Sequence, residues 1–487
     1  MPYYSHLSGP ANVGKFLQSQ GHDVRIAIPP QMKEKMERHG VQLLLYNGLG
    51  EFPEDRYLQD LILKLYFEHT PSQLSRLYYK KDNLVVVTVR NTATKIIKDT
   101  ILRKNIEKFK PDLIILDSNP LTIMLTLIPY KLDIPFVMMG SLGSPQCKRT
   151  PVLPTVFPMK FLPFTDQMTF QQRLLNTFVE LLSYRRNPFI NSSLIEEYVP
   201  EKPHISLIDL QAKAQLWITR QHSVLDYNHP TMPNEKTVAH LQNLTSKALP
   251  PDLQSFMENA DNGVVIVSFG SVLNLPSQVK EKLLSAFQQT KYKFIMRTAD
   301  IQHNNRSDKF MFRKWLPQYD LLRHHKTKLF ISHCGSNGLQ EALFAGVPIL
   351  GFPIIGDQPN NAGKIIRKVY GLKLDLKSFS VQELVSAINE VTTNPKYKAN
   401  VEKASAILKS ERVPPIEEAA FWINHVLKFG GAHLRSYAQD IPLWKYLGLD
   451  IIAFCLLIWH VFVFLIIITL KYCLSRCCMS KQKLKDE

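Results

Sequence analysis

A stretch of 44 residues, from Trp315 to Gln358, limits the possible folds of this chain more than any other segment. It contains a strand-type apolar run at Lys328–Ser332, a small-residue turn, a helical segment at Leu339–Ala345 and a second strand at Val347–Phe352. This order predicts one strand–helix–strand unit. A chain built from such units folds as a parallel sheet with helices on both faces.

The turn between the first strand and the helix has the sequence HCGSNG. A turn of small residues at a helix start leaves backbone N–H groups free, with the positive end of the helix dipole beside them. Glycine also lets the backbone approach a ligand closely. We therefore predict a pyrophosphate-binding site formed by His333, Gly335, Ser336, Asn337 and Gly338.

The same stretch holds polar and aromatic groups suited to the rest of a nucleotide sugar. Asn337 and Glu341 lie one helical turn apart, so one can donate to a phosphate while the other accepts from both ribose hydroxyls. Trp315 offers a flat face for a base, and the Gln318 amide can bond a uracil edge. Taken singly, Glu341 can be a solvated helix residue and Trp315 a core residue.

Asp357 and Gln358 follow a strand that ends at Pro353, where they can reach sugar hydroxyls. The segment from Trp315 to Gln358 resembles the signature of the UDP-glycosyltransferase family in order, spacing and residue type. The resemblance is strongest to its metazoan, membrane-bound branch, which includes the UDP-glucuronosyltransferases. Three further segments agree with that branch: Asp166–Phe170 (DQMTF), His229–Asn234 (HPTMPN) and Val267–Ser271 (VSFGS).

The resemblance implies the GT-B fold, in which two doubly wound Rossmann-like α/β domains face each other across a cleft. Strand and helix signals alternate in both halves of the chain, and the pattern loosens between Pro151 and Lys202, where we expect insertions that line a pocket for an apolar partner. We expect an acceptor-binding domain over 1–226, a linker over 227–241, a UDP-sugar-binding domain over 242–430, a juxtamembrane segment over 431–450, a transmembrane helix over 451–470 and a basic cytosolic tail over 471–487.

Transfer of a sugar to a hydroxyl requires a base for the acceptor proton and a means of stabilising the departing diphosphate. His6 and Asp117 are the candidates for the first task, because Asp117 ends the predicted strand PDLIILD and a carboxylate can orient an imidazole. By residues alone, His6 can equally be a surface residue and Asp117 a turn residue. By resemblance, both occupy the family's catalytic positions.

The leaving charge is predicted to fall on the helix start, on His333 and on Ser271. The sequence has no cluster with the spacing of metal ligands, so we expect a metal-independent transfer that inverts the anomeric centre. We expect no cofactor, with the UDP-sugar as a co-substrate. Cys334 lies in the phosphate turn, where a small side chain is needed; a catalytic thiol is the alternative, but no partner base accompanies it.

The formal charge of +17 is dispersed, without the long basic runs or interleaved aromatics of nucleic-acid-binding proteins, so no nucleic acid is expected as a partner. Ile451–Leu470 is apolar except for His460 and is long enough to cross a bilayer as a single span. Basic residues follow it, which predicts a cytosolic tail and a lumenal body if the full-length protein has a signal peptide; without one, the anchor can insert from the cytosolic side and leave the body in the cytosol. The ending KLKDE resembles a dilysine retrieval signal of the endoplasmic reticulum, and sequons occur at Asn191, Asn243 and Asn305.

Met1 is followed directly by PYYSH, without the charged and apolar leader of a signal peptide, and the family's first strand is expected to be missing. Three readings stay open. The leading one is an enzyme, anchored in the endoplasmic reticulum, that transfers glucuronic acid or glucose to small lipophilic acceptors, with homo- or hetero-oligomers as partners to consider. The second is a non-catalytic nucleotide-sugar-binding homologue, and the third a different GT-B enzyme, such as an epimerase or a lipid-linked sugar transferase.

Overall fold

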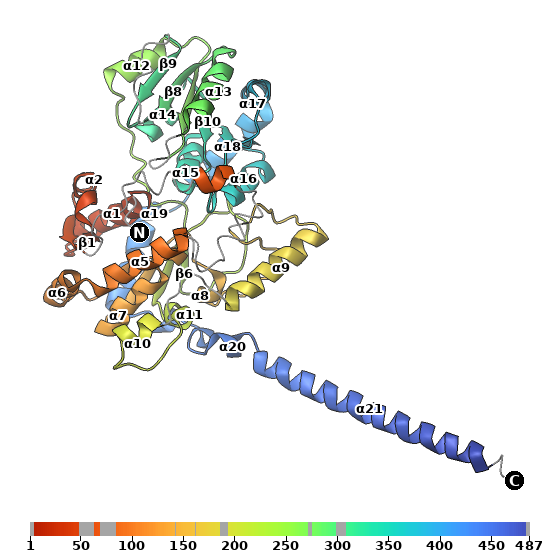
Figure 1. Cartoon of the computed structure of the whole chain (residues 1–487). Coiled ribbons are helices and arrows are strands. Elements are labelled where there is room, and N and C mark those ends of the chain that lie inside the picture. The colour runs from red at the N-terminus through yellow and green to blue at the C-terminus, as the bar shows by residue number, and fades with distance from the viewer. Residues whose placement is uncertain are drawn as a thin grey trace. The chain divides into compact units, whose positions relative to one another are not determined.

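The computed structural model describes residues 4–47, 63–68, 84–141, 143–160, 162–185, 193–270, 275–298 and 308–483. They form two compact units, a body that ends at Arg435 and a C-terminal unit that begins at Ser436. Figure 1 follows the chain from red at the N-terminus to blue at the C-terminus. Within the described residues, all strands belong to the body.

The C-terminal half of the body is built on a six-stranded parallel sheet in the order β12-β11-β10-β7-β8-β9. All residues of the central strand β7 are buried, which agrees with its nearly continuous apolar sequence VVIVS, since a strand covered on both faces must be apolar throughout. The strands are β7 (Val264–Ser268), β8 (Lys293–Arg297), β9 (Phe310–Arg313), β10 (Thr327–Ser332), β11 (Ile349–Gly351) and β12 (Gly371–Lys373).

Helices cover both faces of this sheet. Val265 and Val267 of β7 pack in one apolar cluster with α13 and α17, whereas Val264 and Ile266 pack in another with α12, α14, α15 and α18. The alternation follows from the period of two along a strand. The helices of this half are α12 (Pro251–Glu258), α13 (Ser277–Gln288), α14 (Gln318–Arg323), α15 (Ser336–Ala345), α16 (Gln358–Arg367), α17 (Val381–Thr393) and α18 (Pro395–Lys409).

The N-terminal half holds a four-stranded parallel sheet in the order β3-β4-β5-β6, together with a separate parallel pair, β1 and β2. Strand β3 ends at Asp117, as the sequence predicts. The strands are β1 (Arg25–Ile28), β2 (Gln42–Leu45), β3 (Ile114–Asp117), β4 (Phe136–Gly140), β5 (Leu216–Arg220) and β6 (Glu235–Val238).

The helical segments of this half include α1, which begins in the first described residues. They are α1 (Tyr4–Ser19), η1 (Pro30–Met32), α2 (Lys33–Glu37), α5 (Leu84–Lys98), α6 (Thr100–Phe109), η2 (Pro120–Thr126), α7 (Leu127–Leu132), α8 (Pro145–Lys148), α9 (Phe170–Arg185), α10 (Ser193–Tyr198) and α11 (Leu207–Ala212). The region from Pro151 to Lys202, where the sequence pattern loosens, thus contains a four-turn helix, α9. Several of its apolar side chains face outward, among them Leu174 and Phe178, so its sequence lacks the polar outer face of a typical surface helix.

Helix α19 (Pro415–Phe429) carries the chain from the C-terminal half back to the N-terminal half. Its buried residues Ala419, Ala420, Ile423 and Val426 share an apolar cluster with α1, β4, β5 and β6. A short 3-10 turn, η3 (Ala432–Leu434), follows it. The last helix of the body therefore completes a core whose other members come from the first half of the chain.

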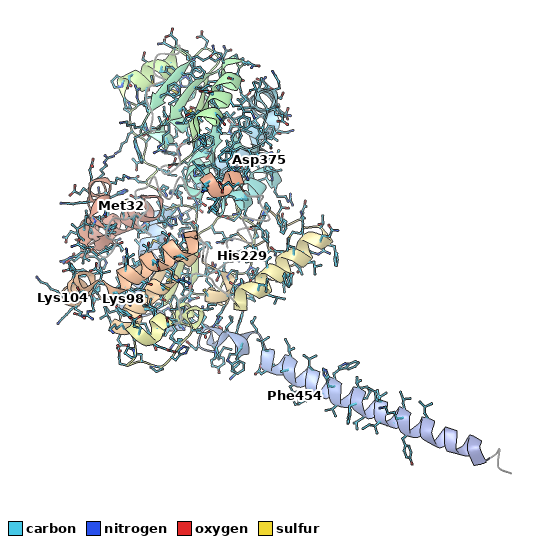
Figure 2. All side chains as sticks on the ribbon, in the orientation of Figure 1. Met32, Lys98, Lys104, His229, Asp375 and Phe454 are labelled. Carbon is cyan, nitrogen blue, oxygen red and sulfur yellow. The ribbon has the colours of Figure 1, made fainter. Side chains whose placement is uncertain are left out.

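A second crossing runs in the opposite direction. Residues 63–68 form a short helix, which is drawn in orange-red near the labels α15 and α16 in Figure 1. Its Tyr66 is buried in the apolar cluster of the C-terminal half, and the Tyr66 hydroxyl donates to Asp375 Oδ1 at 2.7 Å. Asp375 is labelled in Figure 2. The two halves of the body thus exchange one helix each.

The C-terminal unit is helical, with η4 (Tyr437–Gln439), α20 (Leu443–Tyr446) and α21 (Leu449–Lys483). Residues Leu449–Leu474 of α21 have a mean hydropathy of 3.1 and are long and apolar enough to cross a membrane. This span contains the predicted one and extends beyond it at both ends. Side chains such as Phe454 project into solvent along the helix (Figure 2), as expected of a surface that is covered by lipid rather than by protein.

Candidate functional site

The turn from β10 into α15 forms the centre of the predicted phosphate site. Gly335 is the N-cap of α15, so the backbone N–H groups of the first helical turn point outward. The ring of His333 lies between two glycines: a Cβ atom at Gly270 would lie 2.8 Å from His333 Cε1, and one at Gly335 would lie 2.6 Å from His333 Nε2. Both glycines are therefore needed to admit the imidazole.

Burial lowers the pKa of His333 to about 4, so the ring is neutral at pH 7. The structure places no described hydrogen-bond partner on the buried His333 Nδ1. The neighbouring thiol of Cys334 is also buried, and burial raises its pKa above the usual range. Cys334 lies so close to Gly351 that a Cβ there would be 2.4 Å from Cys334 Sγ. This packing favours the structural interpretation of Cys334 over a reactive thiolate.

A hydrogen-bond network joins the starts of α15 and α16. Ser336 Oγ donates to Asp357 Oδ2 at 2.7 Å, and Asn361 Nδ2 donates to the same oxygen at 2.9 Å. Asn361 Nδ2 also reaches the Cys334 carbonyl at 3.1 Å. Asn361 is not among the site residues predicted from the sequence, although its position one helical turn after Asp357 is a usable signal. The network holds two predicted site residues, Ser336 and Asp357, in one place.

Gln358 bonds the backbone of the loop that precedes α16. Its amide oxygen accepts hydrogen bonds from the backbone N–H groups of Ile354 and Ile355, at 2.8 and 3.1 Å. Gln358 thus fixes the loop before α16 through its amide oxygen. Its NH₂ group can still donate a hydrogen bond to a ligand.

The predicted base and ribose contacts lie together. Gln318 Nε2 donates to Glu341 Oε2 at 2.6 Å, and burial raises the pKa of Glu341 to about 7, although this bond opposes the shift. Gly338 lies against Gln318, because a Cβ at Gly338 would be 3.4 Å from Gln318 Nε2. Trp315 is 52% exposed, which leaves part of its ring accessible for stacking.

One contact joins this site to the N-terminal half. Arg220, at the end of β5, donates through Nη1 to Asn337 Oδ1. The guanidinium therefore brings a positive charge to the helix start where the diphosphate is predicted to bind. The sequence analysis missed Arg220, because no local motif links an arginine at a strand end to a turn 117 residues later.

The predicted dyad is assembled at the edge of the N-terminal sheet. His6 lies in the first turns of α1, and its Nδ1 is 2.8 Å from Asp117 Oδ2 at the end of β3. Burial opposes the ionisation of Asp117, but the adjacent His6 and the backbone N–H of Asn119 outweigh it and lower the pKa of the carboxyl to about 2. Asp117 is thus anionic at neutral pH and directed at one ring nitrogen of His6.

An open pocket lies between the two halves of the body and is lined by residues of both. Ser336 and Asp357 line it from the C-terminal half, and Ser141 lines it next to the dyad, since a Cβ at Gly140 would be 3.0 Å from Asp117 Oδ1. Phe157 and Pro158 also line it, which agrees with the expectation that the 151–202 region lines a pocket. His6, Asp117, Trp315, Gln318, His333 and Glu341 lie outside its lining.

Two remaining predictions concern Ser271 and metal ligands. Ser271 lies outside the described residues. Among the described residues, Glu258, His324 and His325 form a group of metal-type side chains whose ligand atoms lie within 4.8 Å of one another. His324 Nδ1 accepts the backbone N–H of Lys326, so His324 Nε2 carries the proton and lies 3.1 Å from Glu258. His324 and Glu258 are thus engaged with each other, and the group does not line the pocket.

The fold has solved counterparts. The glycosyltransferase of kitacinnamycin superimposes with a TM-score of 0.60 at 18% identity, over 87% of this chain and 96% of that one. The calicheamicin glycosyltransferase CalG4 gives a TM-score of 0.61 at 14% identity, over 88% and 96%. These likenesses, together with two parallel sheets that are covered by helices, define a GT-B fold, as the sequence predicts.

The family model described as "UDP-glucoronosyl and UDP-glucosyl transferase" matches residues 3–484. Among relatives, UDP-glucuronosyltransferase 2A2 of Homo sapiens is 30% identical over 87% of this chain and 80% of its own length. UDP-glucuronosyltransferase 2C1 of Oryctolagus cuniculus is 32% identical over 76% of each chain. The chain belongs to this family and is a UDP-glycosyltransferase, which confirms the resemblance seen in the sequence.

Proposed function

We propose that the protein transfers glucuronic acid or glucose from its UDP-sugar to a hydroxyl of a small lipophilic acceptor, with inversion at the anomeric carbon. The observation that carries this proposal is the 2.8 Å approach of His6 Nδ1 to Asp117 Oδ2, next to a pocket lined by donor-side residues. Asp117 fixes the tautomer with the proton on Nδ1, which leaves Nε2 as the base.

In this mechanism, His6 Nε2 takes the proton of the acceptor hydroxyl as the oxygen attacks the anomeric carbon. The bond from that carbon to the UDP oxygen breaks on the opposite side, so an α-linked donor gives a β-glycoside. Asp117, held ionised by its surroundings, stabilises the imidazolium that forms. General-base help of this kind contributes about 10²- to 10⁴-fold in rate.

The departing diphosphate needs positive charge and N–H donors. We assign these to the N-terminus of α15 at Gly335 and Ser336, to Asn337, and to the Arg220 guanidinium that bonds Asn337. Trp315 stacks on the uracil, Gln318 bonds its edge, and Glu341 accepts from the ribose hydroxyls. Asp357 and Gln358 face the sugar, and neutral His333 supports the turn. The groups assigned here need no metal.

The test uses the full chain in isolated membranes with a simple phenol as the acceptor. UDP-glucuronic acid, UDP-glucose and UDP-N-acetylglucosamine are compared as donors, and the anomeric configuration of the product is read by NMR coupling constants. We expect transfer with one of the first two donors, a β-linked product, and no loss of rate in EDTA. A retained α-configuration would refute the single displacement, and loss of transfer in EDTA would refute its metal independence.

We further propose that α21 anchors the enzyme in the endoplasmic-reticulum membrane, with the body in the lumen and the tail in the cytosol. The basic residues after the span support this orientation. Asn243 is exposed and lies in an Asn-x-Thr sequon, so a lumenal body would carry a glycan there. A mobility shift that glycosidase removes, and that Asn243→Gln reduces, is the expected result; an unglycosylated body would contradict the orientation.

A further inference from the structure

Lys160 is a charged residue on the wall of the pocket that neither the fold nor the proposed chemistry uses. It follows Phe157 and Pro158, which line the same pocket, and its ammonium donates to the main-chain carbonyl of Ser141. Among the described residues, no carboxylate lies within ion-pair distance of Lys160 Nζ. Its protein partner is thus a neutral carbonyl oxygen.

Two other lysines, Lys148 and Lys364, act electrostatically on Lys160, but each of them is paired with a carboxylate. Lys148 is paired with Glu235, and Lys364 with Asp226 at 2.7 Å. Each of these carboxylates already has its own cation. A cation withdrawn from water without a counter-ion is costly, so such residues are usually paired or bind a ligand. Lys160 is the lysine of this group that has no anion.

The surroundings also make Lys160 responsive to an anion. Burial, followed by repulsion from Lys148 and Lys364, lowers the pKa of Lys160 to about 7, although the more distant carboxylates of Asp226 and Glu235 oppose this shift. A carboxylate placed beside the amine favours the protonated form and gains a charge-assisted hydrogen bond. The alternative is a purely structural role, in which the lysine stem covers apolar surface while its amine bonds a carbonyl. That role predicts no preference for charged ligands, so the two can be separated.

We propose that Lys160 forms a carboxylate-binding subsite in the pocket between the two halves of the body. The proposal rests on the proposed glycosyl transfer, because it assigns the charge of a substrate in that reaction. Two sources present the same chemistry at this place: the carboxylate of a hexuronic acid on the donor, and a carboxylate on the acceptor. Ser336, Asp357 and Asn361 line the same pocket, so a donor sugar held by Asp357 lies within the same cavity as the amine.

The experiment compares the wild type with Lys160→Met and Lys160→Arg in two arms. The donor arm measures kcat/KM for UDP-glucuronic acid and UDP-glucose with 4-hydroxybenzamide as the acceptor. The acceptor arm fixes the better donor and compares 4-hydroxybenzoate with 4-hydroxybenzamide, which differ in the charged group. In each arm the result is the ratio of kcat/KM for the charged substrate to kcat/KM for the neutral one. A general loss of folded protein or of rate does not change this ratio.

In one arm we expect Lys160→Met to lower this ratio by about 10- to 100-fold, the range of a hydrogen bond to a charged group, and Lys160→Arg to retain part of it. The arm that responds identifies the source of the carboxylate. Lys368→Met is the control, because Lys368 Nζ also donates to a main-chain carbonyl, that of Ser223 at 2.9 Å, but lies outside the pocket lining. It should leave both ratios unchanged.

Unchanged ratios in both arms for Lys160→Met would overturn the subsite, even if kcat/KM fell equally for the charged and neutral members of each pair. Calorimetry with UDP separates this failure from a failure of the proposed function. If UDP binds the wild type and the ratios do not move, the carboxylate subsite alone is wrong. If the wild type neither binds UDP nor transfers any sugar, both proposals fail.

Discussion

Two buried carboxyl groups, one in each half of the body, have pKa values that are shifted in opposite directions. In the N-terminal half, Asp117 faces a histidine and its pKa lies at about 2, whereas in the C-terminal half Glu341 faces an amide and its pKa rises to about 7. A permanent anion suits the task of orienting an imidazole and stabilising its cation. Glu341, whose described hydrogen-bond partner is the Gln318 amide, can in addition accept hydrogen bonds from ligand hydroxyls when they bind. Environments that push two acids apart in this way assign them different functions.

The largest expected effect concerns the dyad. His6→Ala should lower the rate of transfer by about 10²- to 10⁴-fold, because the acceptor hydroxyl loses its base. UDP affinity, measured by calorimetry, should stay at the wild-type value, since His6 lies in the N-terminal half of the body and the predicted UDP contacts lie in the C-terminal half. His22→Ala is the control, because His22 is exposed beyond the end of α1. Normal turnover of the His6 variant would refute the assigned base.

The next effect concerns the aromatic group of the donor side. Trp315→Ala should weaken UDP binding by about 5- to 150-fold, the range expected when a base loses 1–3 kcal/mol of stacking. Trp444→Ala makes a matched control, because Trp444 is also 52% exposed but lies in the C-terminal unit. Similar UDP affinities for the two variants would show that the base does not stack on Trp315.

The pKa of Glu341 predicts a pH dependence of donor binding. Ribose hydroxyls require the ionised carboxylate, so affinity should fall as pH drops below about 7, by about tenfold between pH 8 and pH 6. UDP-glucose is the ligand of choice, since its diphosphate diester does not titrate in this range. Lys160, with a pKa of about 7, has the opposite sign only for ligands that carry a carboxylate, and UDP-glucose has none.

The Glu341→Gln variant isolates the contribution of Glu341 to that profile. Calorimetric titrations at pH 6, 7 and 8 should show that the decline at low pH disappears in Glu341→Gln. His333 does not contribute in this range, because its pKa is about 4. An identical pH profile in the wild type and the variant would contradict the ribose contact.

The smallest effect tests how far the two halves depend on each other. Tyr66→Phe removes the hydroxyl that donates to Asp375 and should lower the free energy of unfolding by about 0.5–1.5 kcal/mol. Tyr437→Phe is the control, since Tyr437 is 72% exposed. The stability of both variants is measured by thermal unfolding with and without UDP. If Tyr66→Phe unfolds like the control, the helix at 63–68 contributes little to the C-terminal half.

Contiguous features were the ones that sequence reasoning could find. The strands β7 and β10 and the cap Gly346 follow from local apolar runs and from glycine's access to positive φ, and Ser336, Asn337 and Glu341 lie on one short helix. The end of β3 at Asp117 followed from its apolar run in the same way. Roles of these residues stay proposals.

Features that depend on tertiary contacts were missed for a physical reason. Arg220 bonds Asn337, which lies 117 positions later in the sequence. Lys160 became a candidate only in the folded chain, where the nearby described carboxylates, Glu235 and Asp226, are paired with other lysines. The bond from Gln358 to the loop backbone was likewise invisible, because the periodicity of side chains does not specify where an amide oxygen points. The helix α9 lacked a polar outer face and so gave no clear amphipathic signal.

The return of α19 to the first core has a consequence for biosynthesis. The four-stranded sheet ends at Val238, but the helix that packs with it begins at Pro415, 177 positions later. At 5–20 residues per second, translation takes roughly 10 to 35 s to supply that helix. During this interval the nascent chain must keep an incomplete apolar surface away from aggregation. We therefore expect chaperone contact during this stage of synthesis, with release once residue 429 has emerged.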